Sequence, residues 1–458
     1  MAEYSLTPVK VPKIKTKYRT IQTALPVPQS LVIFEELRRS EPRSMSGQPP
    51  VLWHKAEGFI VSDRWGNRWI DWSSGVLITN AGHGQRDIAR AVRKLLDRPL
   101  LATYVFPHAD RATLVRMLRE ISPDPENYLV FLLSTGSEAT ENCIKLSKTY
   151  ALQKYGPSRK YVVTFRNAFH GRTMGAQLAG GIERQKTWMV DRDRTFIQVP
   201  FPDGYKNTDT SFDLFLRSLA EQNVKPQQIA GVMSETYQGV GPDFFPVAYA
   251  QQLERFCREY DIVLTMDEVQ AGFGRTGKMF GFEHYGIKPD LIACGKGITS
   301  SLPLSAVIGR RDIMDLYAPG SMTSTHSGSP LAVAAAVANL KVIQRKKLAE
   351  RAARLGAWFV PELERIQRKY PQRLGCCWGK GLVAGIQVVK PGTKEPDPAV
   401  ATAINVACYQ KGLLMFAPVG VAGECLKIAP PLTIAEDALR ESLAVFEEAV
   451  DEVMARLS

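Results

Sequence analysis

The sequence predicts an α/β protein with a large, doubly wound, mostly parallel sheet and a smaller α/β domain. Short apolar runs alternate with helical patterns from about residue 75 to residue 330, which is typical of parallel strands joined by crossover helices. Two of these runs, 262–266 and 290–294, are bounded by polar and glycine residues, as buried parallel strands are. The length of 458 residues exceeds what one simple hydrophobic core holds, so we expect a second domain.

The predicted elements divide the chain into three segments. Residues 1 to about 50 are rich in Pro and Lys and favour an extended arm, while the chain beyond about 335 alternates helices and short strands. We predict an N-terminal segment, 1–74, that packs with a small C-terminal domain, 336–458, and a large domain, 75–335. The other predicted strands are 58–63, 67–72, 128–133, 161–165, 229–233 and 381–389. The predicted helices are 30–39, 139–155, 212–222 and 330–344.

The composition is that of a globular protein, with 45% hydrophobic and 23% charged residues. The net charge of +12 is scattered, without a long Lys/Arg run, so we expect no nucleic-acid partner. The seven cysteines form no CxxC pair and the six histidines are dispersed, which predicts neither disulfides nor a metal site. The N-terminus lacks an apolar signal core, and no run of about 18 apolar residues exists, so we expect a cytoplasmic protein without membrane contact.

An acid and an amine stand at the ends of two predicted strands. Asp267 directly follows the run 262–266, and Lys296 follows the run 290–294 between two glycines. Ligands of parallel sheets bind beyond the carboxyl ends of the strands, so both side chains are expected at the same edge. An amine in a partly desolvated site loses its proton and attacks a carbonyl to form a Schiff base. Pyridoxal phosphate (PLP) forms such a linkage and needs an acid at its pyridinium nitrogen.

The residues around Asp267 and Lys296 favour a PLP site. The alternative is that Asp267 only ends a strand and that Lys296 is solvated. DEVQAGFGRTG at 267–277 and GKG at 295–297 resemble the class III (omega) aminotransferases, which include enzymes of the 4-aminobutyrate and ornithine type. The resemblance covers roughly residues 50–436. It implies a fold type I PLP enzyme in which Lys296 carries the cofactor and Asp267 binds the pyridinium nitrogen. Val269 is expected to pack on the ring and Gln270 to bind the ring hydroxyl.

Two further motifs of this resemblance follow predicted strands. STGSEATE at 134–141 opens a helix, whose free N–H groups form an anion site. The resemblance places the cofactor phosphate at Gly136 and Ser137, and a helix start capped by Ser137 uses the same groups. FHGRT at 169–173 carries Phe169, expected to stack on the cofactor ring, with core packing as its alternative. Arg172 is expected to bind a distal substrate carboxylate.

Another motif, ETYQGV at 235–240, departs from the family pattern EPxQGEG. The resemblance implies that Glu235 supports the ring acid, whereas Val240 replaces the second glutamate. In relatives that glutamate pairs with an arginine that binds the substrate α-carboxylate, and the corresponding cation here is Lys427. Lysine offers a point charge where arginine offers a two-pronged fork. We therefore predict a site relaxed about the α-carboxylate; in the alternative, Lys427 points to solvent and Arg172 binds the carboxylate.

Two other regions are assigned by the resemblance. The segment with Trp72 and Val76 lines the substrate cavity in the family, although ordinary core packing fits these residues equally well. Thr325 lies in a Ser/Gly/Pro-rich loop that reaches the cofactor phosphate of the neighbouring subunit in the family, which implies a homodimer with shared active sites. The alternative is a plain helix-start loop before Pro330.

Three other classes of protein fit parts of the sequence. GFGRTG at 272–277 matches the GxGxxG of NAD-dependent dehydrogenases by letters, but an acid pair separates it from the strand and no helical pattern follows. Racemases, epimerases and lyases of the same fold use the same lysine, so the residues near Lys296 do not exclude them. A binding protein without activity is not expected to keep both Asp267 and Lys296.

The sequence thus predicts a PLP-dependent aminotransferase with Lys296, Asp267 and Glu235 as its catalytic residues. The predicted reaction moves an amino group from an ω-amino acid or amine, such as 4-aminobutyrate, to a 2-oxo acid, either pyruvate or 2-oxoglutarate.

Overall fold

The computed structural model describes residues 4–457, which form two compact units. One unit runs from Arg86 to Glu350, and the other combines the chain up to Gln85 with the chain from Arg351 onward. These boundaries lie later in the sequence than the predicted ones. Residues 74–85 belong with the N-terminal strands because His83 bridges Gly58. The helix after residue 329 packs on two helices of the Arg86–Glu350 unit.

The Arg86–Glu350 unit is built on a seven-stranded, mostly parallel sheet. Only one strand, the second in the order below, pairs antiparallel with its neighbours. This is the predicted fold class. The strand order is β6 (Tyr128–Leu133), β14 (Ser305–Arg310), β13 (Leu291–Cys294), β12 (Val263–Asp267), β9 (Ile229–Glu235), β7 (Tyr161–Phe165) and β8 (Phe196–Val199).

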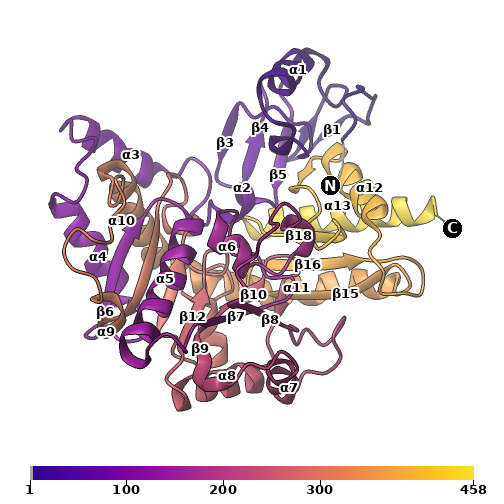
Figure 1. Ribbon diagram of the computed structural model, residues 1–458. Helices are drawn as coiled ribbons and strands as arrows, with labels where there is room; N and C mark the ends of the chain where they lie inside the picture. Colours follow the sequence, from indigo (N-terminus) through magenta and orange to yellow (C-terminus); the bar gives the residue numbers. More distant parts are fainter. Residues whose placement is uncertain (1–3, 458) are drawn as a thin grey trace. The chain divides into compact units, whose positions relative to one another are not determined.

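Helices cover this sheet, and three of them, α3, α4 and α10, gather beside β6 (Figure 1). A two-stranded hairpin, β10 (Tyr237–Gln238) with β11 (Asp243–Phe244), follows β9. The helices are α3 (Arg86–Leu96), α4 (Ala109–Glu120), α5 (Gly136–Tyr155), α6 (Met174–Ala179), α7 (Asp213–Glu221), α8 (Val247–Glu259), α9 (Arg311–Met314) and α10 (Pro330–Arg345).

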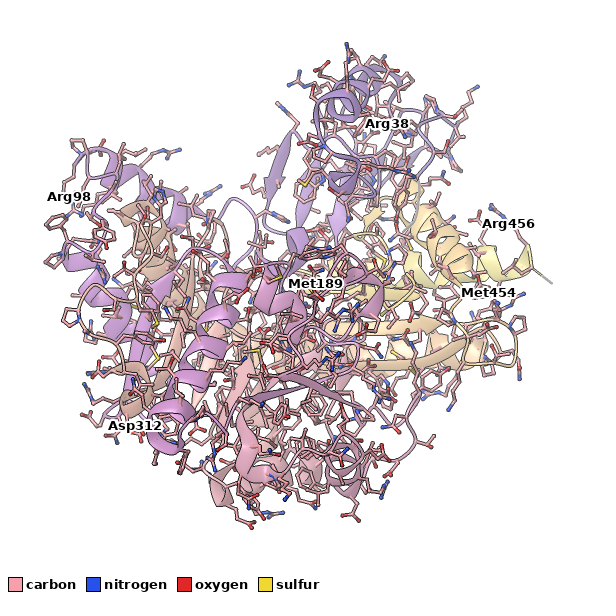
Figure 2. The ribbon with its side chains drawn as sticks, viewed as in Figure 1. Arg38, Arg98, Met189, Asp312, Met454 and Arg456 are labelled. Atoms are coloured by element: carbon pink, nitrogen blue, oxygen red, sulfur yellow. The ribbon has the colours of Figure 1, made fainter. Side chains whose placement is uncertain are left out.

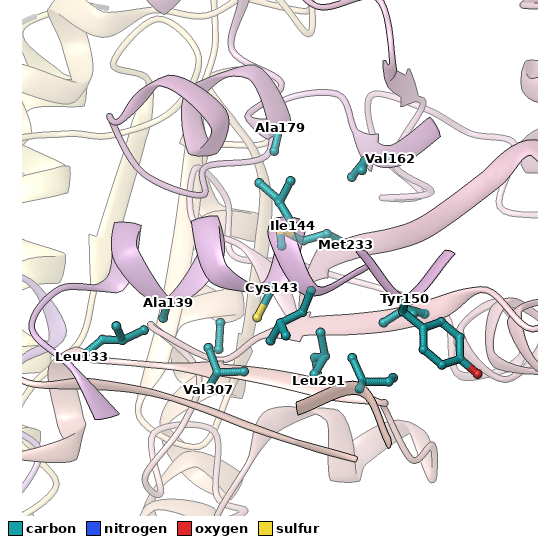
Figure 3. Packing of buried hydrophobic residues seen from close by; sticks show 14 residues of the cluster. Leu133, Ala139, Cys143, Ile144, Tyr150, Val162, Ala179, Met233, Leu291 and Val307 are labelled. Atoms are coloured by element: carbon teal, nitrogen blue, oxygen red, sulfur yellow. The ribbon is translucent and has the colours of Figure 1, made fainter. Parts of the chain in front are cut away.

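The core of this unit lies where α5 packs on the sheet. Buried α5 residues recur at helical spacing, with Ala139, Cys143, Leu146 and Tyr150 on one face. Figure 3 shows side chains of this helix meeting strand residues such as Val307. This packing fixes the start of α5 against the ends of the strands.

The other unit contains one mostly antiparallel sheet and one antiparallel sheet, and it brings distant parts of the chain together. Leu413 pairs parallel with Ile70, which joins the C-terminal part of the chain to the N-terminal sheet. One sheet has the order β1 (Ile14–Lys15), β2 (Thr20–Ile21), β5 (Arg68–Asp71), β4 (Ile60–Ser62), β3 (Lys55–Glu57), with β17 (Leu413–Leu414) on β5. The other has the order β15 (Leu374–Lys380), β16 (Val383–Val388), β18 (Cys425–Ile428). The helices are α1 (Leu31–Ser40), α2 (Ser74–Leu77), α11 (Leu348–Lys369), α12 (Pro398–Gln410) and α13 (Glu436–Ala455).

Most predicted elements are present with small shifts of their ends. The strands predicted at 128–133 and 161–165 have the observed bounds. The GxGxxG stretch at 272–277 forms consecutive turns and opens no helix. Charged side chains such as Arg38, Arg98 and Arg456 point outward (Figure 2). Within residues 4–457 no helix is both long and apolar enough to cross a bilayer.

Candidate active site

Three neighbouring strands bring the predicted acid, its supporting acid and the lysine to one edge of the sheet. Asp267 ends β12 and lies beside Glu235, the last residue of β9. On its other side Asp267 pairs with Ala293 of β13, three residues before Lys296. Because these strands are parallel, their carboxyl ends meet at one edge. The predicted convergence of Asp267 and Lys296 is therefore present.

Lys296 stands on a strained turn directly after β13. Its φ is +41°, in the left-handed region that residues other than glycine rarely adopt, and it begins a short 3₁₀ turn, Lys296–Ile298. The side chain keeps part of its surface exposed, yet the surrounding protein withholds water from the ammonium group. This desolvation lowers the pKa of Lys296, and the negative charges of Asp267 and Glu235 offset only part of the effect. The amine is thus biased towards the neutral form that attacks carbonyls.

Asp267 is held from two directions. Its Oδ1 accepts the Val269 N–H at 3.0 Å, and its Oδ2 lies 2.8 Å from Nδ1 of His170, which is fully buried. Burial acts against a charged imidazole, but the hydrogen bond and the charges of Asp267 and Glu235 outweigh it, so the pKa of His170 is raised. His170 lies in the FHGRT motif, but the sequence alone did not indicate its role. The available signal was its position one residue after Phe169, in the loop that follows β7, which is the next strand beyond β9.

Glu235 ties together two loops at the same edge. Its Oε2 accepts the Phe169 N–H at 2.9 Å, and its Oε1 accepts the Gly239 N–H at 2.8 Å. Burial raises the pKa of Glu235 to about 7, although the His170 charge and these two N–H groups act in the opposite direction. Glu235 therefore positions the Phe169 loop and the hairpin that follows β9.

Glu268, between Asp267 and Val269, anchors the loop after β12. It accepts hydrogen bonds from the Gly281 N–H at 2.8 Å, the Phe282 N–H at 2.9 Å and the Thr236 hydroxyl. Burial raises the pKa of Glu268 to about 7 against these three donors. Thr236 stands where the family pattern has proline, which has no hydroxyl. The departure noted in the sequence thus supplies a donor to a buried acid.

The N-terminus of α5 presents free N–H groups to this edge. Its cap is Thr135, whose hydroxyl accepts the Glu138 N–H at 3.2 Å, while Glu138 accepts the Thr135 N–H at 2.8 Å. The expectation that Ser137 is the cap is wrong, because the helix begins at Gly136. Among residues 4–457 no acceptor lies on the N–H groups of Gly136 and Ser137, so both are available to an anion.

The side chain of Val269 packs closely against the backbone on both sides, at the start of α5 and beside the turn that carries Lys296. A Cβ added to Gly136 would lie 2.9 Å from Cγ1 of Val269, and one added to Gly295 would lie 3.1 Å from the same atom. Gln270 is approached just as closely, because a Cβ added to Gly239 would lie 2.3 Å from Nε2 of Gln270. Val269 and Gln270 are both partly exposed. These two predicted cofactor contacts are therefore placed by tight backbone approaches.

The remaining predicted residues of this unit have varied surroundings. Phe169 is partly exposed, and the guanidinium carbon of the exposed Arg172 lies 5.7 Å from its ring centroid. Val240 is buried in the turn of the β10–β11 hairpin. Thr325 is exposed, in a loop that the neighbouring Ser324 anchors by a 3.3 Å hydrogen bond from its hydroxyl to Glu138.

Three predicted substrate contacts lie in the other unit. Trp72 is a core residue rather than a cavity residue, because its ring is fully buried against Phe359 and Phe446 and its N–H donates to Ser442. Val76 is 44% exposed and has a φ of +65° in the left-handed turn of α2. Lys427 is buried in β18, so the alternative in which it points to solvent is wrong.

Comparisons with known proteins agree with this architecture. The profile described as aminotransferase class-III matches residues 43–450. The chain is 32% identical over 439 residues to the 4-aminobutyrate aminotransferase of Mycobacterium leprae, covering 93% of this chain and 97% of that one. It is 31% identical over 415 residues to the leucine/methionine racemase of Thermococcus litoralis, covering 88% and 91%. A solved aminotransferase of Bacillus anthracis matches with a TM-score of 0.84 and 29% identity, covering 93% and 99%.

The fold and the edge of the sheet define a PLP-dependent enzyme of fold type I. The chain belongs to the class III aminotransferases, and its cofactor is PLP. The residues suit that cofactor on their own chemistry. An amine with a lowered pKa stands beside a buried carboxylate, and two N–H groups without acceptors face the same edge.

We expect Lys296 of the apoenzyme to titrate below an ordinary lysine, because desolvation lowers its pKa. The rate at which added PLP attaches to the protein should therefore rise with pH and level off around a midpoint below 10.5, the ordinary value. Glu235→Gln removes a negative charge that raises the pKa of Lys296, so its midpoint should be lower still. Rapid-mixing absorbance measures both. Glu395→Gln, at an exposed acid, should match the wild type; an upward shift in Glu235→Gln would contradict the assignment.

Proposed function

We propose that this enzyme moves an amino group from an ω-amino acid or amine to a 2-oxo acid, either pyruvate or 2-oxoglutarate, with its cofactor attached to Lys296. The observation that carries the proposal is the desolvated Lys296 beside Asp267 on the neighbouring strand. The similarity to the 4-aminobutyrate aminotransferase of Mycobacterium leprae supports an ω-amino acid as the donor.

Each residue has a defined task in this proposal. Bound PLP supplies an electron-accepting ring that stabilises negative charge at the substrate Cα. The Asp267 carboxylate, oriented by His170, holds a proton on the pyridine nitrogen of that ring. With the cofactor bound, the neutral amine of Lys296 would accept and return the proton of the substrate Cα.

The other side chains of the site bind and orient. Val269 and Phe169 would hold the ring by packing, and Gln270 would offer it a hydrogen bond. The N–H groups of Gly136 and Ser137 would bind the phosphate. Glu235 keeps the Phe169 loop and the Gly239 hairpin in place through its two accepted hydrogen bonds.

Val240 and Lys427 support the proposed substrate class. With valine at 240, the loop carries no acid to pair with a carboxylate-binding cation. In this proposal the buried Lys427 would present a point charge to a substrate carboxylate, where an arginine presents a planar fork. We therefore assign a site that is relaxed about the α-carboxylate. Arg172, which is exposed beside Phe169, is the second cation for a distal carboxylate.

Lys296→Ala should reduce turnover by at least about 100-fold, since it removes the proton-transfer group. The protein should still bind PLP, but without a linkage that borohydride reduces. Absorbance spectra and mass analysis after borohydride treatment test this result. Lys278→Ala, at an exposed lysine, should behave as the wild type. A reducible linkage at another residue in Lys296→Ala would show that the attachment site is wrong.

A donor and acceptor panel that follows keto product and chirality tests the substrate class. We expect ω-amino acids and amines to be used with a 2-oxo acid. Lys427→Ala should lower kcat/KM for carboxylate-bearing substrates about tenfold to 100-fold, the range of a hydrogen bond to a charged group. The control is Lys380→Ala, an exposed lysine of the same three-stranded sheet.

Two outcomes of the panel would overturn this assignment. Strict use of glutamate and 2-oxoglutarate, unaffected by Lys427→Ala, contradicts the relaxed site. Inversion of an amino acid without a keto acceptor identifies a racemase, the second candidate function. That candidate is supported by the similarity to the leucine/methionine racemase of Thermococcus litoralis.

We also propose a homodimer in which Thr325 completes the phosphate site of the neighbouring subunit. Thr325 is exposed, and its loop contacts the segment after α3 through a 2.9 Å hydrogen bond between Tyr104 and Thr323. That segment exposes large apolar side chains, with Leu101 at 55% and Phe106 at 73%. Exposed apolar surface beside this loop suits a second copy of the chain.

Hybrid dimers test the shared site directly. A Lys296→Ala chain and a Thr325→Ala chain should each be impaired alone. In a mixed dimer, one site combines the intact Lys296 of one chain with the intact Thr325 of the other, so remixed subunits should exceed the summed activity of the parents. If both residues served the same chain, mixing would restore nothing. Sedimentation of the wild type as a fully active monomer would also reject the proposal.

A further inference from the structure

The turn that carries Lys296 is held from α10 by one side chain, Asn339. Its amide nitrogen donates to the Gly297 carbonyl at 2.8 Å and to the Ile298 carbonyl at 2.9 Å. Asn339 is fully buried, and it lies on a 16-residue helix that packs on α3 and α4. Asn339 thus fixes, from a long helix, the carbonyl groups of the two residues that directly follow Lys296.

This turn depends on outside support. A left-handed backbone at a lysine is unfavourable and persists only where the surroundings enforce it. The 3₁₀ turn is three residues long, and the hydrogen bond from the Ile298 N–H to the Gly295 carbonyl leaves the two later carbonyls to other donors. Asn339 supplies both donors from a single amide group.

The environment of Asn339 shows that the nitrogen is the functional end of its amide. Its Oδ1 is buried without a hydrogen-bond partner among residues 4–457, which is costly in an apolar core. Exchanging the oxygen and nitrogen would set an oxygen against two carbonyl oxygens, so the orientation is fixed. The buried α10 residues around it are apolar, including Ala335, Ala336 and Val342. A leucine would fill this position without an unpaired oxygen but would lose both donors.

We propose that Asn339 is a positioning residue for Lys296. By fixing the turn at residues 297–298, it keeps Lys296 left-handed and directs its Cα–Cβ bond, so that Nζ reaches the carbonyl of the cofactor and later the substrate Cα. A displacement of about 1 Å at such a centre can cost on the order of 100-fold in rate. The inference rests on the proposed attachment of the cofactor to Lys296.

Two variants remove the donors. Asn339→Leu replaces the amide by an apolar side chain, and Asn339→Asp keeps its shape. Both should slow the attachment of PLP to the apoenzyme about tenfold or more and lower kcat with little change in KM. The critical measurement is the dissociation constant of PLP with and without Lys296. In the Lys296→Ala background, adding Asn339→Leu should leave that constant unchanged, because the effect runs through the lysine.

The matched control is Asn405→Leu. Asn405 is also buried and also donates to a backbone carbonyl, that of Phe416 at 3.0 Å, but it lies in the other unit. It should lower the melting temperature without slowing PLP attachment.

The proposal is overturned if both Asn339 variants attach PLP at the wild-type rate. It is also overturned if Asn339→Leu weakens PLP binding equally with and without Lys296, or if both variants fail to fold while Asn405→Leu folds. A reducible linkage at a residue other than Lys296 in the wild type would remove the proposed function itself.

Discussion

The parallel pairing of β12 with β9 on one side and β13 on the other determines the rest of this site. Its register places Asp267 beside both Glu235 and Ala293, so two carboxylates leave the sheet at one level and Lys296 follows three residues after Ala293. A slip of one residue would turn Asp267 to the opposite face of the sheet. The hairpin after β9, the loop after β12 and the turn after β13 all start from this alignment.

Burial of like charges is the electrostatic consequence of that alignment. Burial raises the pKa of Glu235 and of Glu268 from 4.5 to about 7. The folded chain binds these protons more tightly than the unfolded chain, so their contribution to the free energy of unfolding falls as pH rises from about 4.5 to 7. The contribution of His170 to the free energy of unfolding also falls as pH rises, but over a higher pH range. The pKa of His170 is raised above 6.5, so its contribution is complete below that pH and is lost as pH rises through the folded value. Burial of these groups therefore lowers the stability of the folded chain as pH rises, and the same desolvation lowers the pKa of Lys296.

The sequence was sufficient for the residues whose position follows from a strand end. Asp267 and Lys296 each end an apolar run, and the topology of a parallel sheet brings such ends together. It was insufficient for side chains whose partners are distant in the chain. His170 meets Asp267 across 97 residues, and Asn339 meets Gly297 across 42. Apolar periodicity reports burial but not the partner of a buried polar group, which is also why the core position of Trp72 stayed open.

The helix α10 starts five residues after Thr325 and carries Asn339 nine positions after its first residue, Pro330. Each helical residue adds about 1.5 Å of rise and 100° of rotation. The nine positions therefore determine how far along the helix Asn339 lies and in which direction its side chain points. A single insertion or deletion between Pro330 and Asn339 would swing the amide away from the Gly297 and Ile298 carbonyls. The outer face of α10 can therefore vary in sequence over evolution, whereas the number of residues in its first half is constrained.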